Sequence, residues 1–415
     1  MSKLQHDARK LIDEAIEANM PQAAVRNALK NHHFSENIYL VAIGKAAWSM
    51  AHSAWEELGG RIKGGIVITK YNHSLGDIPG IDVVEAGHPI SDENTIAGTQ
   101  KAVKLAESLG EKDELLFLIS GGGSALFEQP LPGLGLADIV DVNNQLLACG
   151  ADIVEINMIR KRLSSVKAGR FAQVCAPAKV FAVVLSDILG DRLDSIASGP
   201  AAPDLSTAED ALGVVKKYGL VLNDTIMGYL AKETPKKLDN VEAVVTGSVR
   251  TLCEDTARIA SELGYTPYLL ATEINCEARE AGRLMSAIAK QIDSGNCAFK
   301  RPCAVILGGE TVVRVKGKGK GGRNQELALA AAEGIVGLKN MLIFSVGSDG
   351  TDGPTDAAGG IVDGESLGHL KQKGLSLSEI LDNNDAYNGL AQIDGLIITG
   401  PTGTNVNDVS VILCE

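Results

Sequence analysis

A run of glycine and lysine, KGKGKGG at residues 316–322, precedes Arg323 and an Ala/Leu-rich stretch that we expect to be helical. Glycine lets backbone N–H groups approach a ligand closely, and the start of a helix adds partial positive charge. The guanidinium of Arg323 suits phosphate or carboxylate. The pattern indicates an anion-binding site, although a solvated turn with lysines for solubility has the same composition. Its predicted phosphate-binding residues are Gly319, Gly321, Gly322 and Asn324.

A second glycine cluster, SGGGS, follows the apolar run LLFLI at residues 115–119. Three consecutive glycines cost conformational entropy, so we favour a nest of N–H groups for an anion over a tight turn, which needs only one glycine. Lys45 also follows an apolar run, and a lysine where a helix opens is unfavourable unless an anion is near. The predicted phosphate-binding residues here are Ser120, Gly121, Gly122, Gly123 and Ser124.

Acidic residues follow two further apolar runs. Asp187 follows residues 180–185 after Ser186, and Asp349 lies in the glycine-rich acidic stretch at 347–356. A carboxylate at such a place can hold Mg²⁺ or accept a hydroxyl proton, and capping a helix is the alternative. We therefore predict Asp187 as catalytic or metal-binding and Asp349 as a further metal ligand.

Four other residues are predicted to bind substrate or to support residues that do. His88 lies in the turn GHP, and Arg160 belongs to the basic segment at 157–162, which serves a nucleotide or faces solvent. Glu310 ends an apolar run, and Thr402 lies in the stretch TGPTGTNVND.

Each of the main clusters directly follows an apolar run of strand length, and helical patterns separate most of these runs. This alternation predicts a mostly parallel, doubly wound α/β sheet, in which ligands bind at the carboxyl ends of the strands. We expect a helix from Ser91 to Leu109 with Ser91 as its cap. The polar segment at 232–240 is a plausible junction, so we predict two domains, 1–237 and 238–415, with a new β/α series beginning after the junction.

Composition excludes several classes of protein. With 415 residues, a net charge of −13 and 4% aromatic residues, the chain does not resemble a nucleic-acid-binding protein. No run reaches the length of a transmembrane helix, and no signal-peptide core is visible. The seven cysteines form no metal-binding spacing, which predicts reduced thiols in a cytoplasmic protein.

The string Gly317, Gly319, Gly322 satisfies GxGxxG and would suggest a dinucleotide fold. The match is weak because the preceding segment, 311–315, alternates apolar and polar residues instead of forming a buried strand. Walker A, HExxH and GxSxG motifs are absent from the sequence. A phosphoryl-transfer enzyme of this sequence must therefore bind phosphate in another way.

Taken together, the motifs resemble the glycerate 2-kinase family with a C-terminal MOFRL domain, a family also known under the name hydroxypyruvate reductase. The matching stretches are IGKAAW (43–48), GHPISDENT (87–95), LISGGGSALFEQP (118–130), INMIRKRLSSVKAG (156–169), LSDILGDRLDSIASGP (185–200), LGGETVVRVKGKGKGGRNQE (307–326), SVGSDGTDGPTDAAGG (345–360) and TGPTGTNVND (399–408).

The resemblance implies a Rossmann-like N-terminal domain, a MOFRL-type C-terminal domain and an active site in the cleft between them. It further implies transfer of the γ-phosphoryl group of ATP to the 2-hydroxyl of D-glycerate, with Lys45 and Arg323 as catalytic residues and Mg²⁺ or another divalent cation as cofactor. The expected partners are these small molecules, and a homodimer is the one assembly we consider. The alternatives are an NAD(P)H-dependent hydroxypyruvate reductase and a non-catalytic sensor of phosphorylated sugar acids.

Overall fold

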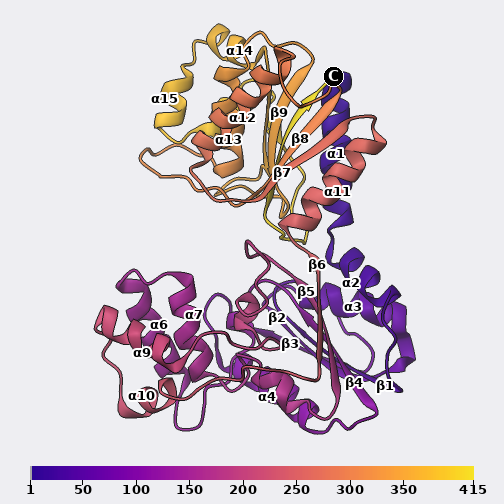
Figure 1. The fold of residues 1–415 in the computed structure, drawn as a ribbon, viewed down its shortest axis with the longest axis vertical. Coiled ribbons are helices and arrows are strands. Elements are labelled where there is room, and N and C mark those ends of the chain that lie inside the picture. Colours follow the sequence, from indigo (N-terminus) through magenta and orange to yellow (C-terminus); the bar gives the residue numbers. More distant parts are fainter. Residues whose placement is uncertain (1) are drawn as a thin grey trace. The chain divides into compact units, whose positions relative to one another are not determined.

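The computed structural model describes residues 2–415, which form two compact units (Figure 1). The N-terminal unit is Ala24–Thr246, and the C-terminal unit is Gly247–Glu415 together with the chain up to Ala23. This division differs from the predicted boundary at 237/238 in two ways. Strand β6 (Val241–Gly247) joins the first sheet, and helix α1 (Lys3–Ala18) packs on α11 (Val249–Glu262) of the C-terminal unit.

The N-terminal unit is built on a six-stranded sheet in the order β3-β2-β1-β4-β5-β6. Neighbouring strands from β3 through β5 pair in parallel. This is the strand order of doubly wound nucleotide-binding folds. The strands before β6 are β1 (Asn37–Ile43), β2 (Ile62–Lys70), β3 (Ile81–Ala86), β4 (Asp113–Ile119) and β5 (Lys179–Leu185).

Apolar side chains on successive strand residues enter different cores because they point to opposite faces of the sheet. Leu40 and Ala42 belong to the core formed with α2 and α3, whereas Val41 and Ile43 belong to the core formed with α4 and α8. Both faces are therefore covered, as the apolar runs predicted. The elements around the two faces of this sheet include short helices and two 3₁₀ turns. They are α2 (Pro21–Lys30), α3 (Ala47–Leu58), α4 (Glu93–Glu107), α5 (Gly123–Leu126), α8 (Arg170–Val174), η1 (Gly59–Arg61) and η2 (Ile196–Ser198).

A separate group of helices has its own apolar core beside this sheet (Figure 1). It consists of α6 (Leu136–Ala148), α7 (Ile153–Leu163), α9 (Ala208–Tyr218) and α10 (Asp224–Leu230).

Buried ion pairs at the C-terminal end of α7 link it to the following segments. Arg162 is fully buried and bonds to Asp204 at 3.3 Å, and Lys161 contacts Asp204 at 3.3 Å and Asp194 at 3.0 Å. Arg170 donates to the carbonyl of Lys161 at 2.6 Å. Lys161 and Arg162 therefore neither face solvent nor remain available to a nucleotide, the two roles considered for this basic segment.

The C-terminal unit has a mixed six-stranded sheet in the order β11-β10-β9-β12-β8-β7. Only β7 and β8 pair in parallel among its neighbours. β10 and β12 were not predicted, because the acidic loop and the terminal apolar run lack a helix between them and the preceding strands. The strands are β7 (Thr266–Ile274), β8 (Cys303–Gly309), β9 (Met341–Gly347), β10 (Gly359–Asp363), β11 (Leu396–Ile397) and β12 (Asp408–Cys414).

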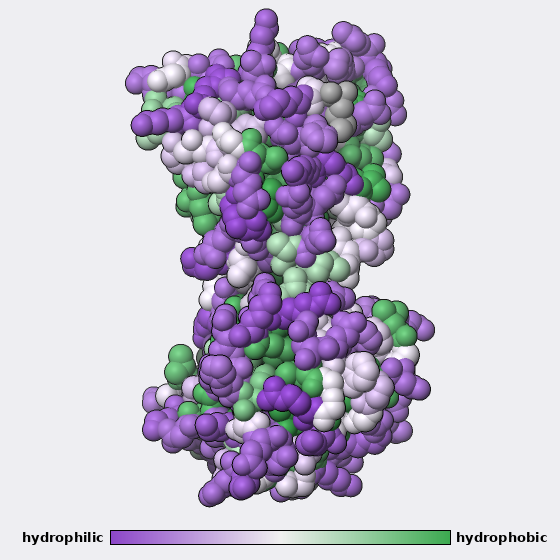
Figure 2. All heavy atoms as spheres, turned by 90° about the vertical axis from the view of Figure 1, so that its right-hand side faces the viewer, coloured by the Kyte–Doolittle hydropathy of each residue, from purple (hydrophilic) through white to green (hydrophobic). Residues whose placement is uncertain are grey.

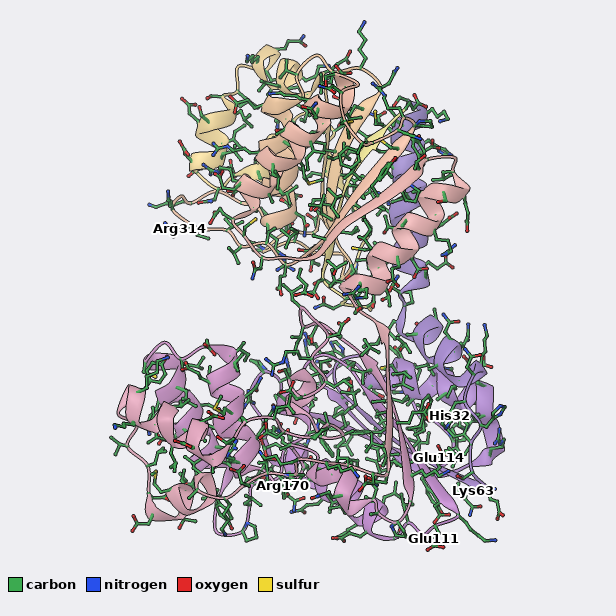
Figure 3. All side chains as sticks on the ribbon, in the orientation of Figure 1. His32, Lys63, Glu111, Glu114, Arg170 and Arg314 are labelled. Atoms are coloured by element: carbon green, nitrogen blue, oxygen red, sulfur yellow. The ribbon has the colours of Figure 1, made fainter. Side chains whose placement is uncertain are left out.

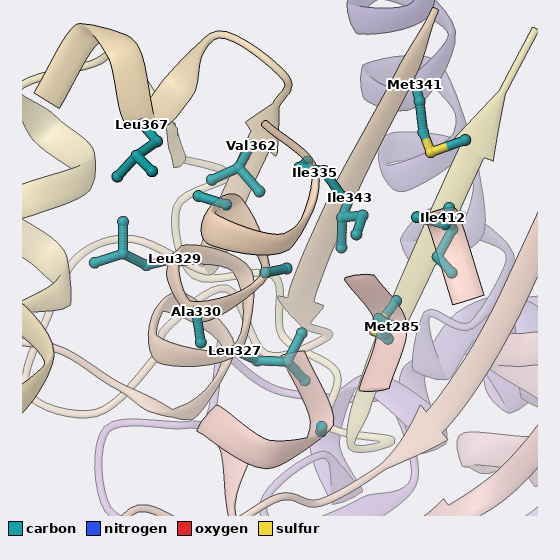
Figure 4. Close-up of a cluster of buried hydrophobic side chains, with 14 of the residues drawn as sticks. Met285, Leu327, Leu329, Ala330, Ile335, Met341, Ile343, Val362, Leu367 and Ile412 are labelled. Carbon is teal, nitrogen blue, oxygen red and sulfur yellow. The ribbon is translucent and has the colours of Figure 1, made fainter. Parts of the chain in front are cut away.

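The core on one face of this sheet is aliphatic, with Met285, Leu327 and Ile343 near its centre (Figure 4). Helices α1 and α11 contact strands of the same sheet outside this core. The remaining helices of the unit, which contribute to the aliphatic core, are α12 (Ala278–Asp293), α13 (Arg323–Gly334), α14 (Ser366–Gln372), α15 (Leu377–Asp382) and α16 (Ala386–Ala391).

The polar surface and the free cysteines are those expected from the composition of the chain. Polar residues predominate between small apolar patches on the face in Figure 2. No helix within residues 2–415 is both long and apolar enough to cross a membrane. All seven cysteines are free thiols, as predicted.

Removing Asp204 should destabilise the N-terminal unit, because Lys161 and Arg162 would keep buried charges without their partner. We expect Asp204→Ala to lower the free energy of unfolding by about 3–5 kcal/mol. The matched control is Asp239→Ala, because the Asp239 carboxylate is largely exposed. This variant should lower the free energy of unfolding by less than about 0.5 kcal/mol. Urea unfolding of both variants measures this, and equal losses in the two would refute the role of the buried cluster.

Candidate active site

The loops after β1 and β4 lie side by side at the carboxyl end of the first sheet, because these strands pair in parallel. In this strand order the β1/β4 boundary is the switch point at which ligands bind. The Lys45 N–H donates to the carbonyl of Gly121 at 2.9 Å, and the Ala46 N–H donates to Ser120 Oγ at 3.1 Å. The structure therefore brings Lys45 and the loop at 120–124 together.

Glycine is required where these loops touch. At Gly44, with φ of +112°, a Cβ would lie 2.3 Å from Ser120 Oγ. At Gly121, a Cβ would lie 2.2 Å from Asp187 Oδ2. The Asp187 carboxylate, which follows β5, is therefore packed directly on the glycine loop. Three of the predicted clusters meet at one edge of the sheet.

His88, which follows β3, also reaches this loop. A Cβ on Gly122 would lie 3.0 Å from His88 Nε2 and 3.2 Å from Lys45 Cε. Burial, followed by the charge of Lys45, lowers the pKa of His88 below its usual value. The imidazole is therefore neutral at pH 7 and can serve as a hydrogen-bonding group beside the Lys45 ammonium.

The loop at 120–124 has the backbone of an anion-binding turn. The Gly123 N–H donates to the carbonyl of Ser120 at 3.3 Å within the turn, and the Ser120 N–H donates to the carbonyl of Ile43 in β1 at 3.0 Å. Gly122 is in the left-handed conformation, with φ of +84°. Turns of this kind direct successive N–H groups to one side and form concave anion sites. The Ser124 hydroxyl is engaged separately, with Ser198 Oγ at 2.9 Å.

A buried lysine that the sequence did not single out supports this loop. Lys167 is fully buried and donates to the carbonyls of Ser124 at 3.0 Å and Phe127 at 2.8 Å. It also pairs with Glu128 at 2.9 Å. Burial lowers the pKa of Lys167. Glu128 and Lys167 lie in two of the stretches that match the family, at 118–130 and 156–169. No spacing rule predicts that two charged residues 39 positions apart form a pair.

In the C-terminal unit, Arg323 is the first residue of α13 and is held by two carboxylates. Its Nε and Nη2 donate to Asp408 at 2.5 and 3.1 Å, and its Nη1 lies 3.2 Å from Glu310. Burial opposes the charge, but the hydrogen bonds and charge of Asp408 raise the pKa of Arg323 further. Glu310 is positioned in turn by Asn407 at 3.2 Å. Asp408 was missed because it opens the unpredicted strand β12.

A second unpredicted carboxylate, Asp352, caps the start of α13. It accepts the N–H groups of Asn324 at 3.2 Å and Gln325 at 2.8 Å. The Asn324 side chain is buried and also internal, because its Oδ1 accepts from Ser345 Oγ at 2.5 Å. These bonds fix Asn324 within the C-terminal unit, and its predicted role in phosphate binding stays a prediction.

Backbone N–H groups of the glycine- and lysine-rich run at 316–322 also donate to acceptors within the protein. The N–H groups of Lys316 and Gly317 donate to Asn384 Oδ1 at 2.7 and 2.9 Å. The Gly319 N–H donates to the carbonyl of Asn383 at 2.8 Å. The segment at 383–385 therefore supplies the acceptors for these N–H groups, and the predicted phosphate-binding role of Gly319 stays a prediction. The roles of Gly321 and Gly322 stay predictions.

Asp349 and Thr402 are neighbours within the C-terminal unit. The Thr402 N–H donates to the Asp349 carbonyl at 3.2 Å, and its hydroxyl donates to the Ser348 carbonyl at 2.6 Å. Asp349 Oδ1 accepts the Thr351 N–H at 3.0 Å. Among residues 2–415, no group of three or more His, Cys, Asp or Glu side chains is arranged to hold a metal ion. The metal-binding roles of Asp187 and Asp349 stay predictions.

Arg160 lies in α7, where it lines a cavity formed with α6. Burial lowers the pKa of Arg160, and the charge of Glu128 opposes this effect. Its predicted role in binding substrate stays a prediction.

Asp352 should titrate unusually high, because burial raises its pKa from 3.8 to about 6. The folded protein then keeps a proton that the unfolded chain releases, so this group makes stability fall as the pH rises from about 4 to about 6. Carboxyl-carbon NMR of the folded protein should show this pKa, and unfolding of Asp352→Asn should have a flatter pH dependence than the wild type. The matched control is Asp239→Asn. A pKa near 4 for Asp352 would contradict this assignment.

Comparison with known proteins agrees with both units. Residues 7–231 match the family model described as Domain of unknown function (DUF4147), and residues 303–408 match the MOFRL family. The D-glycerate 2-kinase of Thermotoga maritima is 51% identical over 97% of both chains. The glycerate 2-kinase of Pyrococcus horikoshii is 38% identical over 97% of this chain and 96% of its own.

The fold agrees as well. The crystal structure of a glycerate kinase from Thermotoga maritima superimposes with a TM-score of 0.96 at 50% identity and covers 99% of each chain. The predicted two-domain α/β fold and the sequence resemblance are thereby confirmed. The chain belongs to the glycerate 2-kinase family, with a DUF4147 domain followed by a MOFRL domain.

Proposed function

We propose that this protein is a D-glycerate 2-kinase, which converts ATP and D-glycerate into ADP and 2-phosphoglycerate. One observation carries the proposal. Lys45, the glycine loop and Asp187 meet at the carboxyl ends of β1, β4 and β5 in a chain that is 51% identical to a D-glycerate 2-kinase over 97% of its length.

Phosphoryl transfer requires positioning and neutralised charge more than covalent chemistry by the protein. The N–H groups of Gly121 and Gly122 suit phosphate oxygens, and Lys45, whose Cε lies near Gly122, supplies positive charge there. The neutral imidazole of His88 can hydrogen-bond a substrate without adding a second positive charge. These groups account for the handling of the transferred phosphoryl group.

In the reaction the 2-hydroxyl oxygen of D-glycerate bonds to the γ-phosphorus as the bond from that phosphorus to the ADP oxygen breaks. The hydroxyl proton must leave, and Asp187 is the carboxylate at the glycine loop that can accept it. Asp187 is equally suited to Mg²⁺, which is usually held by one or two carboxylates together with substrate phosphates. A bound Mg²⁺ would neutralise phosphate charge, and both roles of Asp187 remain within the proposal.

Arg323 contributes the second cation. Asp408 and Glu310 hold its guanidinium in one orientation through three of its N–H groups, which leaves two N–H groups for phosphate or substrate carboxylate. That Lys45 and Arg323 act in one cleft stays a prediction.

The GxGxxG string does not support the reductase alternative. The GxGxxG string lies in the loop at 310–322, between β8 and α13, instead of in a tight turn, and Gly319 is paired with Asn383. The cytoplasmic location, the divalent cation and a homodimer stay predictions from the sequence.

The purified protein with ATP, D-glycerate and Mg²⁺ should form 2-phosphoglycerate, because the proposed transfer is to the 2-hydroxyl. Phosphorus NMR separates this product from 3-phosphoglycerate. The control reaction contains hydroxypyruvate and NADH, and we expect no oxidation of NADH. Formation of 3-phosphoglycerate, or turnover only with NADH, would refute the proposal.

Lys45→Ala should lower kcat roughly a hundred- to ten-thousandfold, because a cation at the transferring phosphoryl group is lost. Arg323→Lys should lower kcat in the same direction while keeping a charge beside buried Asp408, which protects the fold. The matched controls are Lys63→Ala and Arg314→Lys, which change exposed side chains of the same types (Figure 3). Steady-state kinetics with thermal unfolding of each variant measures the effects.

A double variant tests whether the two cations serve one chemical step. Residues that act as a unit show losses far from multiplicative. The combined variant Lys45→Ala, Arg323→Lys should therefore lose much less than the product of the single losses. Near-normal turnover of either single variant would remove that residue from the mechanism.

A further inference from the structure

A cavity of about 320 Å³ opens in the N-terminal unit between α6, α7 and the segment that follows His88. Its volume is at the lower end of small-molecule sites, which span about 300–1,000 Å³. None of the proposed catalytic residues lines it. The reaction as described above leaves this cavity without a role.

The walls of the cavity are aliphatic. Leu136, Ile139 and Ile156 line it, together with Leu147 and Ile153. Leu147 and Ile153 are 66% and 61% exposed, although they lie on helices whose apolar faces form a core. Large aliphatic groups at the mouth of a cavity lose water contact when a flat apolar ligand binds. A small charged molecule such as glycerate gains nothing from such walls.

Two polar atoms in these walls are buried and have no hydrogen-bond partner within the described part of the chain. They are Asn143 Oδ1, an acceptor, and Arg160 Nε, a donor. Buried polar atoms without partners are rare in folded proteins and costly. An acceptor and a donor on an otherwise aliphatic wall fit a ligand that is flat, apolar on its faces and polar at its edges.

The cavity is connected to the glycine loop. Pro89 and Ser91 line it, and Pro89 directly follows His88, whose ring touches Gly122. The Ser91 hydroxyl donates to the carbonyl of Ala125, in the helix that follows the loop, at 2.7 Å. Ser91 was expected to cap α4, but Asp92 does so, which leaves Ser91 to join the cavity segment to the loop.

We propose that this cavity binds the adenine base of the nucleotide, with its phosphates at the loop at 120–124. The assignment rests on the proposed kinase function. Asn143 Oδ1 accepts from the exocyclic amino group of adenine, as asparagine does when it recognises this base. Arg160 Nε donates to a ring nitrogen or to the ribose. A guanine base carries an acceptor where adenine carries that amino group, so the site prefers ATP to GTP.

The test measures nucleotide binding separately from turnover. The titration probe is MgADP in calorimetry without glycerate, and the KM values for ATP and glycerate come from kinetics. Asn143→Leu removes the acceptor, and Leu147→Glu places a charge at the exposed mouth, where it does not threaten the fold. Asn143→Asp retains an acceptor oxygen, and Val221→Glu is the matched control, since Val221 is 82% exposed and lies outside the cavity.

Asn143→Leu and Leu147→Glu should each weaken MgADP binding and raise KM for ATP about tenfold or more, with KM for glycerate within twofold. Asn143→Asp should recover most of the affinity, and Val221→Glu should equal the wild type. The preference for ATP over GTP should shrink in Asn143→Leu.

Unchanged MgADP binding in both cavity variants overturns the assignment even if the wild type phosphorylates glycerate. Equal rises in both KM values also overturn it, because they indicate a general structural effect. If the wild type binds MgADP but does not phosphorylate glycerate, the kinase function fails, and the same binding comparison still decides whether the base occupies the cavity.

Discussion

The close approach of the β1 and β4 loops is the constraint on which the candidate site of the N-terminal unit depends. Ser120 Oγ accepts from the Ala46 N–H at 3.1 Å and lies where a side chain on Gly44 would be. This contact holds Lys45 against the turn formed by Gly121 and Gly122. A doubly wound sheet creates the opportunity because its chain diverges to opposite faces at this boundary. Glycine makes use of it because no other residue leaves room for the two backbones.

Buried charge holds the groups around both cations in place. In the N-terminal unit, Lys167 pairs with Glu128 and donates to a carbonyl of the glycine loop. In the C-terminal unit, Arg323 donates to Asp408. Such pairs are costly to desolvate and add little net stability, so their value lies in fixing one arrangement. In a phosphoryl-transfer site, an orientation fixed before substrate arrives avoids reorganisation during the reaction.

Much of the fold could be predicted because it depends on local pattern. The apolar runs at the positions of β1, β4 and β5, each ended by glycine or a polar residue, identified both the parallel sheet and the edge that carries the site. The domain boundary was less accessible, because β6 joins the first sheet only through long-range pairing. The place of strand β12 in its sheet was inaccessible for a similar reason. The strand is inserted between β8 and β9 from the far end of the chain, an arrangement that no local window contains.

The two glycine-rich segments show where sequence reasoning reaches its limit. Both have the composition of an anion site, and both precede helices. In the folded protein the loop at 120–124 carries Lys45, His88 and Asp187 around it, whereas the run at 316–322 directs several of its N–H groups to Asn383 and Asn384. Composition describes what a loop is able to bind, but not whether another part of the chain already occupies its donors.

The sequence by itself therefore determined the α/β class, the family and the residue types available for phosphate chemistry, because these follow from short-range periodicity and from motifs read in order. Only the tertiary structure decided the partners of each group, such as Asp408 with Arg323 and Asp352 with the start of α13. Those pairings join residues 85 and 27 positions apart. Their strength depends on burial, which is a property of the packed fold and not of any segment alone.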